Sequence, residues 1–419
     1  MKDNRLVIQN INIFNSDSGE FDANKTIVVE NQKITWIGNE SQFEKTNLDQ
    51  IINGENKFCI PGLIDCHVHL DGTSTLNYER EFLRTKTTMY GYTALLNARK
   101  HLISGFTTLR DCGGLLWGST LREVFREKMF YGPRLLVAQH TIGQWGNQED
   151  MGPDEIIDAY KKYETLSGVD GVIHAVRERK RQGSDFIKTL TTGGVLHGVE
   201  SQLNRSLFND EELKAMVTEA HRIGMHLACH AHGDEGILRA SIAGIDTVEH
   251  GSFISEETAK IMVQNGTYLV PTQTSAFINK PDVMKNIAPE VQKKTIEVDK
   301  AMFENHKMAF EKGVKIALGT DVGVPGNFHG ESAKEITSMV EVVGMTPSQA
   351  ILCATREAAI ATKQYQYIGS IEVGKFADFC ILSNNPINDI KILEDKSIID
   401  YVIKDGEVMV KSGIIQDKV

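Results

Sequence analysis

The sequence predicts an α/β protein, a (β/α)8 TIM-like barrel with a small β-sandwich domain formed by both chain ends. Two observations lead to this fold class. Eight short apolar runs alternate with amphipathic stretches through the middle of the chain, which is the pattern of a (β/α)8 barrel. Both ends are instead rich in short strand-like segments separated by turn residues. The 419 residues are sufficient for one large barrel and one small domain.

The two chain ends are predicted to form one domain together. The first end contains RLVIQNINIF and KTIVVENQKITWIGN, and the last contains FADFCILS and SIIDYVIKDGEVMV. Neither end could bury a hydrophobic face by itself. We therefore expect residues 1–58 and 368–419 to pair as the two parts of a β-sandwich, beside a barrel over residues 59–367.

The barrel strands can be assigned in chain order. Their expected positions are residues 62–70, 106–111, 134–139, 186–194, 226–233, 247–250, 268–273 and 315–321. The stretches between them have helical patterns: NDEELKAMVTEAHRIG, for example, begins with a capping asparagine and ends in glycine. In a barrel of this kind, functional side chains stand at the C-terminal ends of the strands.

Composition narrows the class of partner. The formal net charge is −11 and no stripe of lysine and arginine gathers, so we expect a small-molecule partner and no nucleic acid. No apolar run approaches the ~20 residues that cross a bilayer, and the N-terminus has no secretory pattern. The six scattered cysteines form no C-x-x-C pair and are expected to be reduced thiols, which favours a cytoplasmic protein without membrane contact. Enzymes of this size are commonly symmetric assemblies, so we also expect a homo-oligomer.

Polar side chains with metal-binding chemistry stand at the predicted strand ends. A strand alternates its faces, so the two histidines of HVH would lie side by side. The full set is His67, His69, Lys188, His230, His232, His250 and Asp321. Each alone has an ordinary structural explanation, but their convergence on one barrel mouth predicts a site for two divalent cations, with zinc the first candidate. A lysine would contribute only as a neutral amine or as an anion, such as a carbamate bridging two ions ~3.5–4 Å apart.

A series of motifs in a fixed order connects the chain to a known family. They are PGLIDCHVHL, GFTTLRD, IKTLTTGGV, HAHG, VEHG and LGTDVGVPG, followed by MTPSQAILCATREAA and IGSIEVGKFADFCIL. The chain resembles the amidohydrolase superfamily over almost its whole length. Within it, the chain is similar to the branch of metal-dependent dipeptidases and carboxypeptidases related to imidazolonepropionase.

The resemblance implies a role for each of these residues. His67 and His69 would bind the more buried metal ion with Asp321, the carbamate of Lys188 would bridge both ions, and the second ion would be held by His230 and His250. Asp321 would also take a proton from the bridging water as it attacks an amide carbonyl, and pass that proton to the leaving amine. The implied substrate is a dipeptide or an N-acyl amino acid.

The sequence indicates the residues that would contact the substrate less clearly than it indicates the metal ligands. The candidates are His232, Gln148, Trp145, Arg205 and His329. Gln148 stands where many relatives have a histidine over the substrate carbonyl. The acidic loop WGNQED favours a C-terminal arginine or lysine in the substrate, although an ordinary solvated loop explains it equally well. The alternatives are an Xaa-Pro dipeptidase, a cyclic-amide hydrolase of the imidazolonepropionase type, a deaminase, or a metal-free descendant that only binds a ligand.

Overall fold

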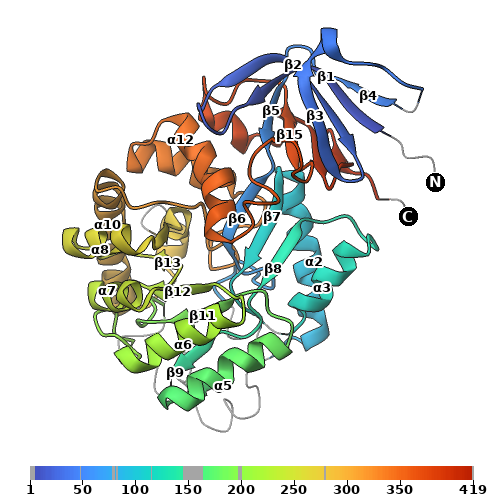
Figure 1. Ribbon diagram of the computed structural model, residues 1–419. Helices are drawn as coiled ribbons and strands as arrows, with labels where there is room; N and C mark the ends of the chain where they lie inside the picture. Colours follow the sequence, from blue (N-terminus) through green and yellow to red (C-terminus); the bar gives the residue numbers. More distant parts are fainter. Residues whose placement is uncertain are drawn as a thin grey trace.

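The computed structural model describes residues 5–47, 49–77, 81, 84–114, 116–144, 164–196, 201–277 and 280–417. Figure 1 shows a central array of strands surrounded by helices, and beside it a β-sheet, drawn in blue and red, that contains both ends of the chain. The predicted fold class, a barrel with a β-sandwich built from both ends, is confirmed. The residue bounds given above for the two domains stay a prediction.

Seven strands and one further segment with isolated bridges form the barrel among the described residues, and each overlaps one of the apolar runs assigned from the sequence. They are β6 (Leu63–Val68), β7 (Phe106–Asp111), β8 (Arg134–Val137), β11 (Ile187–Leu190), β12 (Leu227–Ala231), β13 (Thr247–His250), β14 (Tyr268–Val270) and residues 315–322. Every residue of β6, β7, β11 and β13 is buried. Strands covered on both faces require continuous apolar runs, which is why these runs could be recognised in the sequence.

The barrel strands pair in parallel within two sheets. The sheet orders are β6-β7-β8 and β10-β9-β11-β12-β13-β14, the additional strands being β9 (Ile142–Gln144) and β10 (Glu164–Leu166). Residues 315–322 join the sheets on one side, through a bridge from Ile316 to β14 and a bridge from Val322 to β6. On the other side, the amide of Asp185 donates to the carbonyl of Val137 at 2.8 Å. Regular sheet pairing is therefore interrupted in two places, between β14 and β6 and between β8 and β11. Isolated bridges and hydrogen bonds connect the strands there.

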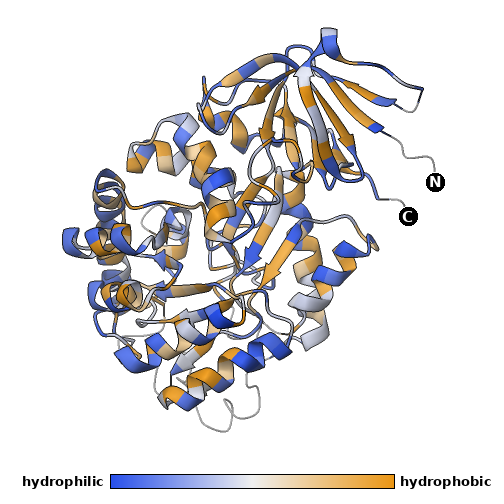
Figure 2. Cartoon of the chain, viewed as in Figure 1, coloured by the Kyte–Doolittle hydropathy of each residue, from blue (hydrophilic) through white to orange (hydrophobic). Residues whose placement is uncertain are grey.

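Helices surround the strands, and their outward faces are the more hydrophilic ones (Figure 2). They are α2 (Thr87–Ile103), α3 (Gly118–Arg126), α5 (Gly168–Arg181), α6 (Asp210–Arg222), α7 (Asp234–Ala243), α8 (Glu256–Asn265), α9 (Pro281–Met284), α10 (Pro289–Glu311), α11 (Ala333–Ser338), α12 (Pro347–Leu352) and α13 (Ala358–Ala361). The predicted cap of α6 is present: the side chain of Asn209 accepts a hydrogen bond from the amide of Glu212 at 2.9 Å. Helix α8 ends at Gly266 in the left-handed conformation that favours glycine.

The two chain ends share one nine-stranded sheet. Its strands are β1 (Arg5–Phe14), β2 (Phe21–Glu30), β3 (Lys33–Asn39), β4 (Asp49–Asn53), β5 (Phe58–Pro61), β15 (Phe379–Leu382), β16 (Ile399–Lys404), β17 (Glu407–Lys411) and β18 (Ile414–Ile415). The two ends meet where β15 pairs antiparallel with β5. Residues from both ends, including Ile8, Ile27, Phe379 and Ile403, pack into one buried apolar cluster. Because neither end could bury this surface alone, the cluster is what holds the domain together.

A glycine at the start of α7 allows two loops to approach closely. A Cβ atom added at Gly233 would lie 2.0 Å from the backbone oxygen of Leu203, which cannot move without shifting its chain. We expect Gly233→Ala to lower the free energy of unfolding by about 2 kcal/mol, as overpacking does. Urea denaturation measures the change.

The matched control is Gly171→Ala within α5, where the added Cβ would lie 3.6 Å from the nearest atom of Leu166, an ordinary contact. This variant is expected to be as stable as the wild type or up to about 1 kcal/mol more stable, because alanine favours a helix interior. Equal stability of the two variants would contradict the predicted clash.

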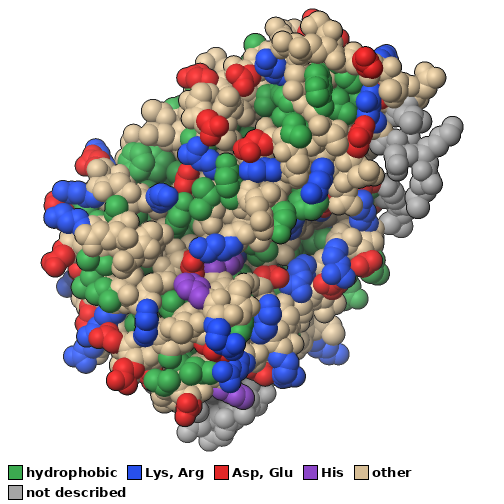
Figure 3. Space-filling model, in the orientation of Figure 1, with side chains coloured by type: hydrophobic (Ala, Val, Ile, Leu, Met, Phe, Trp, Pro, Cys, Tyr) green, Lys and Arg blue, Asp and Glu red, His purple; other side chains and the backbone are tan. Residues whose placement is uncertain are grey.

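The surface in Figure 3 mixes charges of both signs with hydrophobic side chains, and histidine side chains are visible near the centre of this face. Within the part of the chain that the structure describes, no helix is both long and apolar enough to span a membrane.

Candidate active site

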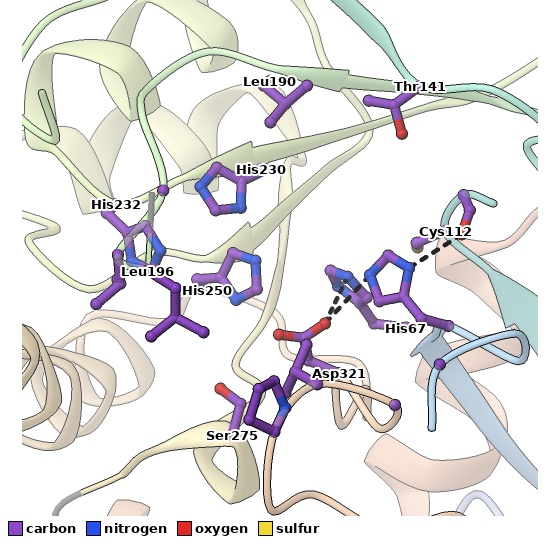
Figure 4. Close-up of a pocket in the computed structure, with 18 of the residues that line it drawn as sticks. His67, Cys112, Thr141, Leu190, Leu196, His230, His232, His250, Ser275 and Asp321 are labelled. Carbon is purple, nitrogen blue, oxygen red and sulfur yellow. Dashed lines mark hydrogen bonds and ion pairs between the residues drawn. The ribbon is translucent and has the colours of Figure 1, made fainter. Parts of the chain in front are cut away.

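A cavity of about 300 Å³ lies at the C-terminal ends of the barrel strands. It brings together all six residues proposed as metal ligands, and His232 lies in its wall as well. Figure 4 shows two groups of these side chains: His67 and Asp321 on one side, and His230, His232 and His250 on the other. The six proposed ligands are His67, His69, Lys188, His230, His250 and Asp321.

The first group is centred on Asp321. Its Oδ1 lies 3.2 Å from Nε2 of His69 and 3.4 Å from Nε2 of His67. The Nζ atom of Lys188 lies 3.3 Å from the same nitrogen of His67. Lys188 has an exposed fraction of only 4%. Four groups with metal-binding chemistry, from three different strands, therefore face one another within the barrel.

The second group consists of three imidazole rings from β12 and β13. The ring of His250 lies 4.6 Å from that of His230 and 4.9 Å from that of His232, measured between centroids. Nδ1 of His250 is hydrogen-bonded to the hydroxyl of Thr272, and Nδ1 of His232 to that of Ser252, each at 2.8 Å. These contacts fix the orientation of both rings.

Backbone conformation contributes to the position of two of the ligands. His250 has φ of 72° and Asp321 has φ of 58°, both in the left-handed region that residues other than glycine rarely adopt. Both residues stand where a barrel strand turns into a loop. Such conformations persist only where the surrounding structure imposes them, and they concentrate at functional sites.

Burial and neighbouring charges set the protonation of these groups. Burial, reinforced by Lys188, lowers the pKa of His67 to about 4, and burial lowers the pKa of His232 to about 3. Burial alone would raise the pKa of Asp321, but the imidazoles of His67 and His69 outweigh it and hold that pKa below its usual value. At His69 burial lowers the pKa, but Asp321 outweighs it and raises that pKa above its usual value. Neutral imidazoles, such as those of His67 and His232, and an ionised carboxylate are the forms that bind metal ions.

A buried ion pair behind the first group is a feature that the sequence reasoning missed. Glu249 accepts a hydrogen bond from Nδ1 of His67 at 2.8 Å and another from Nη2 of Arg110 at 2.7 Å. Burial would raise the pKa of Glu249, but Arg110 and His67 together hold it well below its usual range. The sequence does contain one sign of this ion pair: Arg110 and Glu249 are charged residues inside the otherwise apolar runs FTTLRD and TVEH.

The donor set fits divalent metal ions. Among the described residues, His67, His69 and Asp321 form one group with ligand atoms within 4.8 Å of one another, and the three histidines of the second group form another. In three of the proposed ligand rings Nδ1 is held by a hydrogen bond: in His67 by Glu249, in His250 by Thr272, and in His69 by the carbonyl of Gly113 at 3.0 Å. Hydrogen bonds of this kind, made by the ring nitrogen that does not bind the ion, orient metal-binding imidazoles.

The remaining predicted substrate contacts have different positions. Arg205 is exposed and is not part of the described cavity lining. His329 lies behind the cavity wall, where Nε2 bonds to the carbonyl of Gly72 at 3.0 Å and Nδ1 lies 3.1 Å from Nε2 of His101. Trp145 and Gln148 lie outside the described residues. Of these candidates, His232 alone is placed among the described lining residues.

Part of the cavity wall is apolar. It includes Leu196, Phe277, and Val298 and Met302 from one face of α10. Among the described lining residues, two carboxylates occur besides that of Asp321, those of Asp71 and Asp299. Lys188 is the only lysine or arginine among the described lining residues. The cavity thus combines an apolar wall with negative charge.

The barrel, its accessory sheet and a cavity with imidazole, lysine and carboxylate groups at the strand ends define a class of barrel hydrolases that have donor groups suited to metal ions. The chain belongs to the amidohydrolase family, whose pattern matches residues 58–409. It is therefore a hydrolase of amide bonds. Members of this family generally use metal ions, and the described residues include candidate groups to hold them.

Individual relatives agree with this assignment. Ochratoxinase of Aspergillus niger is 28% identical over 416 residues, which cover 94% of this chain and 85% of that protein. The crystal structure of a Xaa-Pro dipeptidase with bound methionine in the active site is similar with a TM-score of 0.85 and 33% identity, covering 96% of this chain and 99% of that one. A prolidase complexed with N-methylphosphonate-L-proline has a TM-score of 0.88 and 27% identity, covering 97% of this chain and 100% of that one.

Proposed function

We propose that the protein is a binuclear metal-dependent peptidase that hydrolyses the amide bond of dipeptides or N-acyl amino acids. The observation that carries this proposal is the convergence of six potential ligands, from five barrel strands, in one cavity. They are His67, His69, Lys188, His230, His250 and Asp321. A protein that only binds a ligand would not need this set.

Two divalent cations, with zinc the first candidate, would be held by these residues. His67, His69 and Asp321 would hold one ion, His230 and His250 the other, and Lys188 would contribute to both as a carbamate. That carbamate forms when the neutral amine adds to CO2 and releases a proton. When bound, the ions supply Lewis acidity that polarises the substrate carbonyl and makes water more acidic.

The side chains of the protein would perform the proton transfers and exclude bulk water. Asp321 is buried and ionised at the centre of the first group, so it can accept a proton from the attacking water and donate it to the leaving amine. Burial of the cavity strengthens the electrostatic interactions between its charged groups and the substrate, because the charges are less screened than in bulk water.

The cavity walls support a basic residue at the C-terminal position of the substrate. An aliphatic stem of lysine or arginine would contact apolar side chains such as Val298 and Met302, while its cationic head would be attracted to Asp71 or Asp299. The second candidate is an Xaa-Pro dipeptidase, which the names of two structural relatives favour.

A substrate panel tests the proposal. The purified enzyme, loaded with zinc, is incubated with Xaa-Arg, Xaa-Lys and Xaa-Pro dipeptides and with N-acetyl amino acids, and the free amino acid is measured. We expect release from this panel, fastest from Xaa-Arg or Xaa-Lys, and loss of activity after dialysis against a chelator. Fast turnover of Xaa-Pro dipeptides, without turnover of Xaa-Arg or Xaa-Lys dipeptides, would favour the second candidate. No release from any of them would contradict the proposed activity and favour a ring-opening hydrolase, a deaminase or a binding protein.

A further inference from the structure

The buried ion pair behind the cavity is connected to it through a single ligand. Oε2 of Glu249 accepts the hydrogen bond from Nδ1 of His67, while Oε1 accepts from Nη2 of Arg110. The side chains of Glu249 and Arg110 are 0% exposed. We propose that Glu249 is a positioning residue for the first metal ion and that Arg110 holds its carboxylate in place. This inference rests on the proposed function, because it requires His67 to be a metal ligand.

The hydrogen bond from Nδ1 decides which nitrogen of His67 faces the cavity. An imidazole that donates from Nδ1 to a carboxylate keeps the lone pair of Nε2 for a metal ion. In this protein, that Nε2 lies 3.3 Å from Nζ of Lys188 and 3.4 Å from Oδ1 of Asp321. Without Glu249, the ring could adopt the other tautomer or rotate, and the ligand atom would leave this group.

Arg110 fixes the carboxylate by contacts with several strands. Its Nε donates to the carbonyl of Cys66 at 2.5 Å, and its Nη1 donates to the hydroxyl of Thr247 at 3.1 Å. The guanidinium carbon lies 5.2 Å from the ring centroid of Phe186, over its face. Cys66 precedes His67 in β6, and Thr247 lies in the same strand as Glu249. The planar, forked guanidinium therefore aligns the strand that carries the ligand with the strand that carries its positioning carboxylate.

A purely structural ion pair would have different consequences. Replacing one partner of such a pair destabilises the fold but leaves the affinity of the folded protein for metal ions unchanged. A positioning carboxylate instead changes the affinity and the ligand geometry of one of two ions, and loss of such a partner typically weakens binding by about 10- to 100-fold.

Cobalt titration separates these cases. The metal-free full-length protein is titrated with Co²⁺ in the presence of bicarbonate, and both the bound cobalt and its visible absorption spectrum are recorded. We expect two ions in the wild type, and in Glu249→Gln one site weakened by about 10- to 100-fold with an altered spectrum. The matched control is Asp378→Asn, which breaks another buried ion pair, that of Asp378 with Arg134 away from the cavity lining, and should keep both sites.

Each outcome is informative. If Glu249→Gln binds two ions with wild-type affinity and spectrum, and only its melting temperature falls, the inference is wrong. If the wild type binds no cobalt, the proposed metal-dependent function fails, and the inference fails with it. If Glu249→Gln does not fold, the double variant Arg110→Met with Glu249→Gln, which removes both charges, is titrated in the same way. One weakened site then supports the inference, and two wild-type sites overturn it.

Discussion

Lys188→Ala is expected to lower kcat/KM by about a thousandfold or more, equivalent to about 4 kcal/mol of transition-state stabilisation. The reason is that Lys188 lies beside the first group and lines the cavity that contains the second: its Nζ lies 3.3 Å from Nε2 of His67, and the cavity also contains His230 and His250. Alanine would leave both ions without the anion proposed to bridge them. The variant should also retain fewer than two ions per chain.

Steady-state assays with the best substrate of the panel, together with metal analysis after gel filtration, measure both effects. Lys312→Ala is the control, because Lys312 is an exposed residue at the C-terminal end of α10 that pairs with Glu256 at 2.8 Å, and it should retain full activity. A short carboxylate such as propionate is expected to restore part of the activity of Lys188→Ala, since it can occupy the space of the missing carbamate. Full activity of Lys188→Ala with two bound ions would remove the carbamate from the mechanism.

Asp321→Asn is expected to lower kcat by about a hundredfold to ten-thousandfold, the usual contribution of a positioned general base and acid. Asparagine has almost the same size, and it tolerates the left-handed backbone that Asp321 adopts with φ of 58°. The substitution therefore removes the proton acceptor without adding backbone strain. Because the amide oxygen remains, the change in kcat should exceed the change in KM.

Kinetics and metal content of Asp321→Asn are measured side by side. Asp405→Asn is the matched control: Asp405 is also left-handed, with φ of 51°, but it lies beside the terminal sheet and pairs with Arg134. We expect this variant to keep the wild-type kcat. If Asp321→Asn kept its metal ions and lost less than tenfold in kcat, another group would have to move the proton.

The barrel could be predicted from the sequence because its signals are local. Each fully buried strand is a short apolar run, and helices such as α6 carry their caps within a few residues. The candidate ligands could be predicted for the same reason. The C-terminal ends of all strands of a parallel barrel lie at one mouth. A histidine that the sequence assigns to a strand end is therefore expected to face the side chains at the other strand ends.

The parts that could not be predicted depend on long-range geometry. The pairing of Glu249 with His67 joins residues 182 positions apart. A charged residue inside the apolar run TVEH marks Glu249 as unusual, but no local pattern indicates its partner. His329 follows the last barrel strand, which suggested a place on the rim, but its loop turns so that the ring packs against His101 behind the wall. The path of a loop is set by contacts that no local pattern encodes.

The pairing of β5 with β15 has a consequence for synthesis of the chain. The backbone hydrogen bonds of β5 (Phe58–Pro61) are complete only after β15 (Phe379–Leu382) has been synthesised. During translation the first half of the sandwich is therefore on the nascent chain with an unpaired strand edge, while about three hundred residues of barrel emerge from the ribosome. Such an edge can pair with a neighbouring polypeptide, so slow elongation or truncation before β15 should favour aggregation over folding.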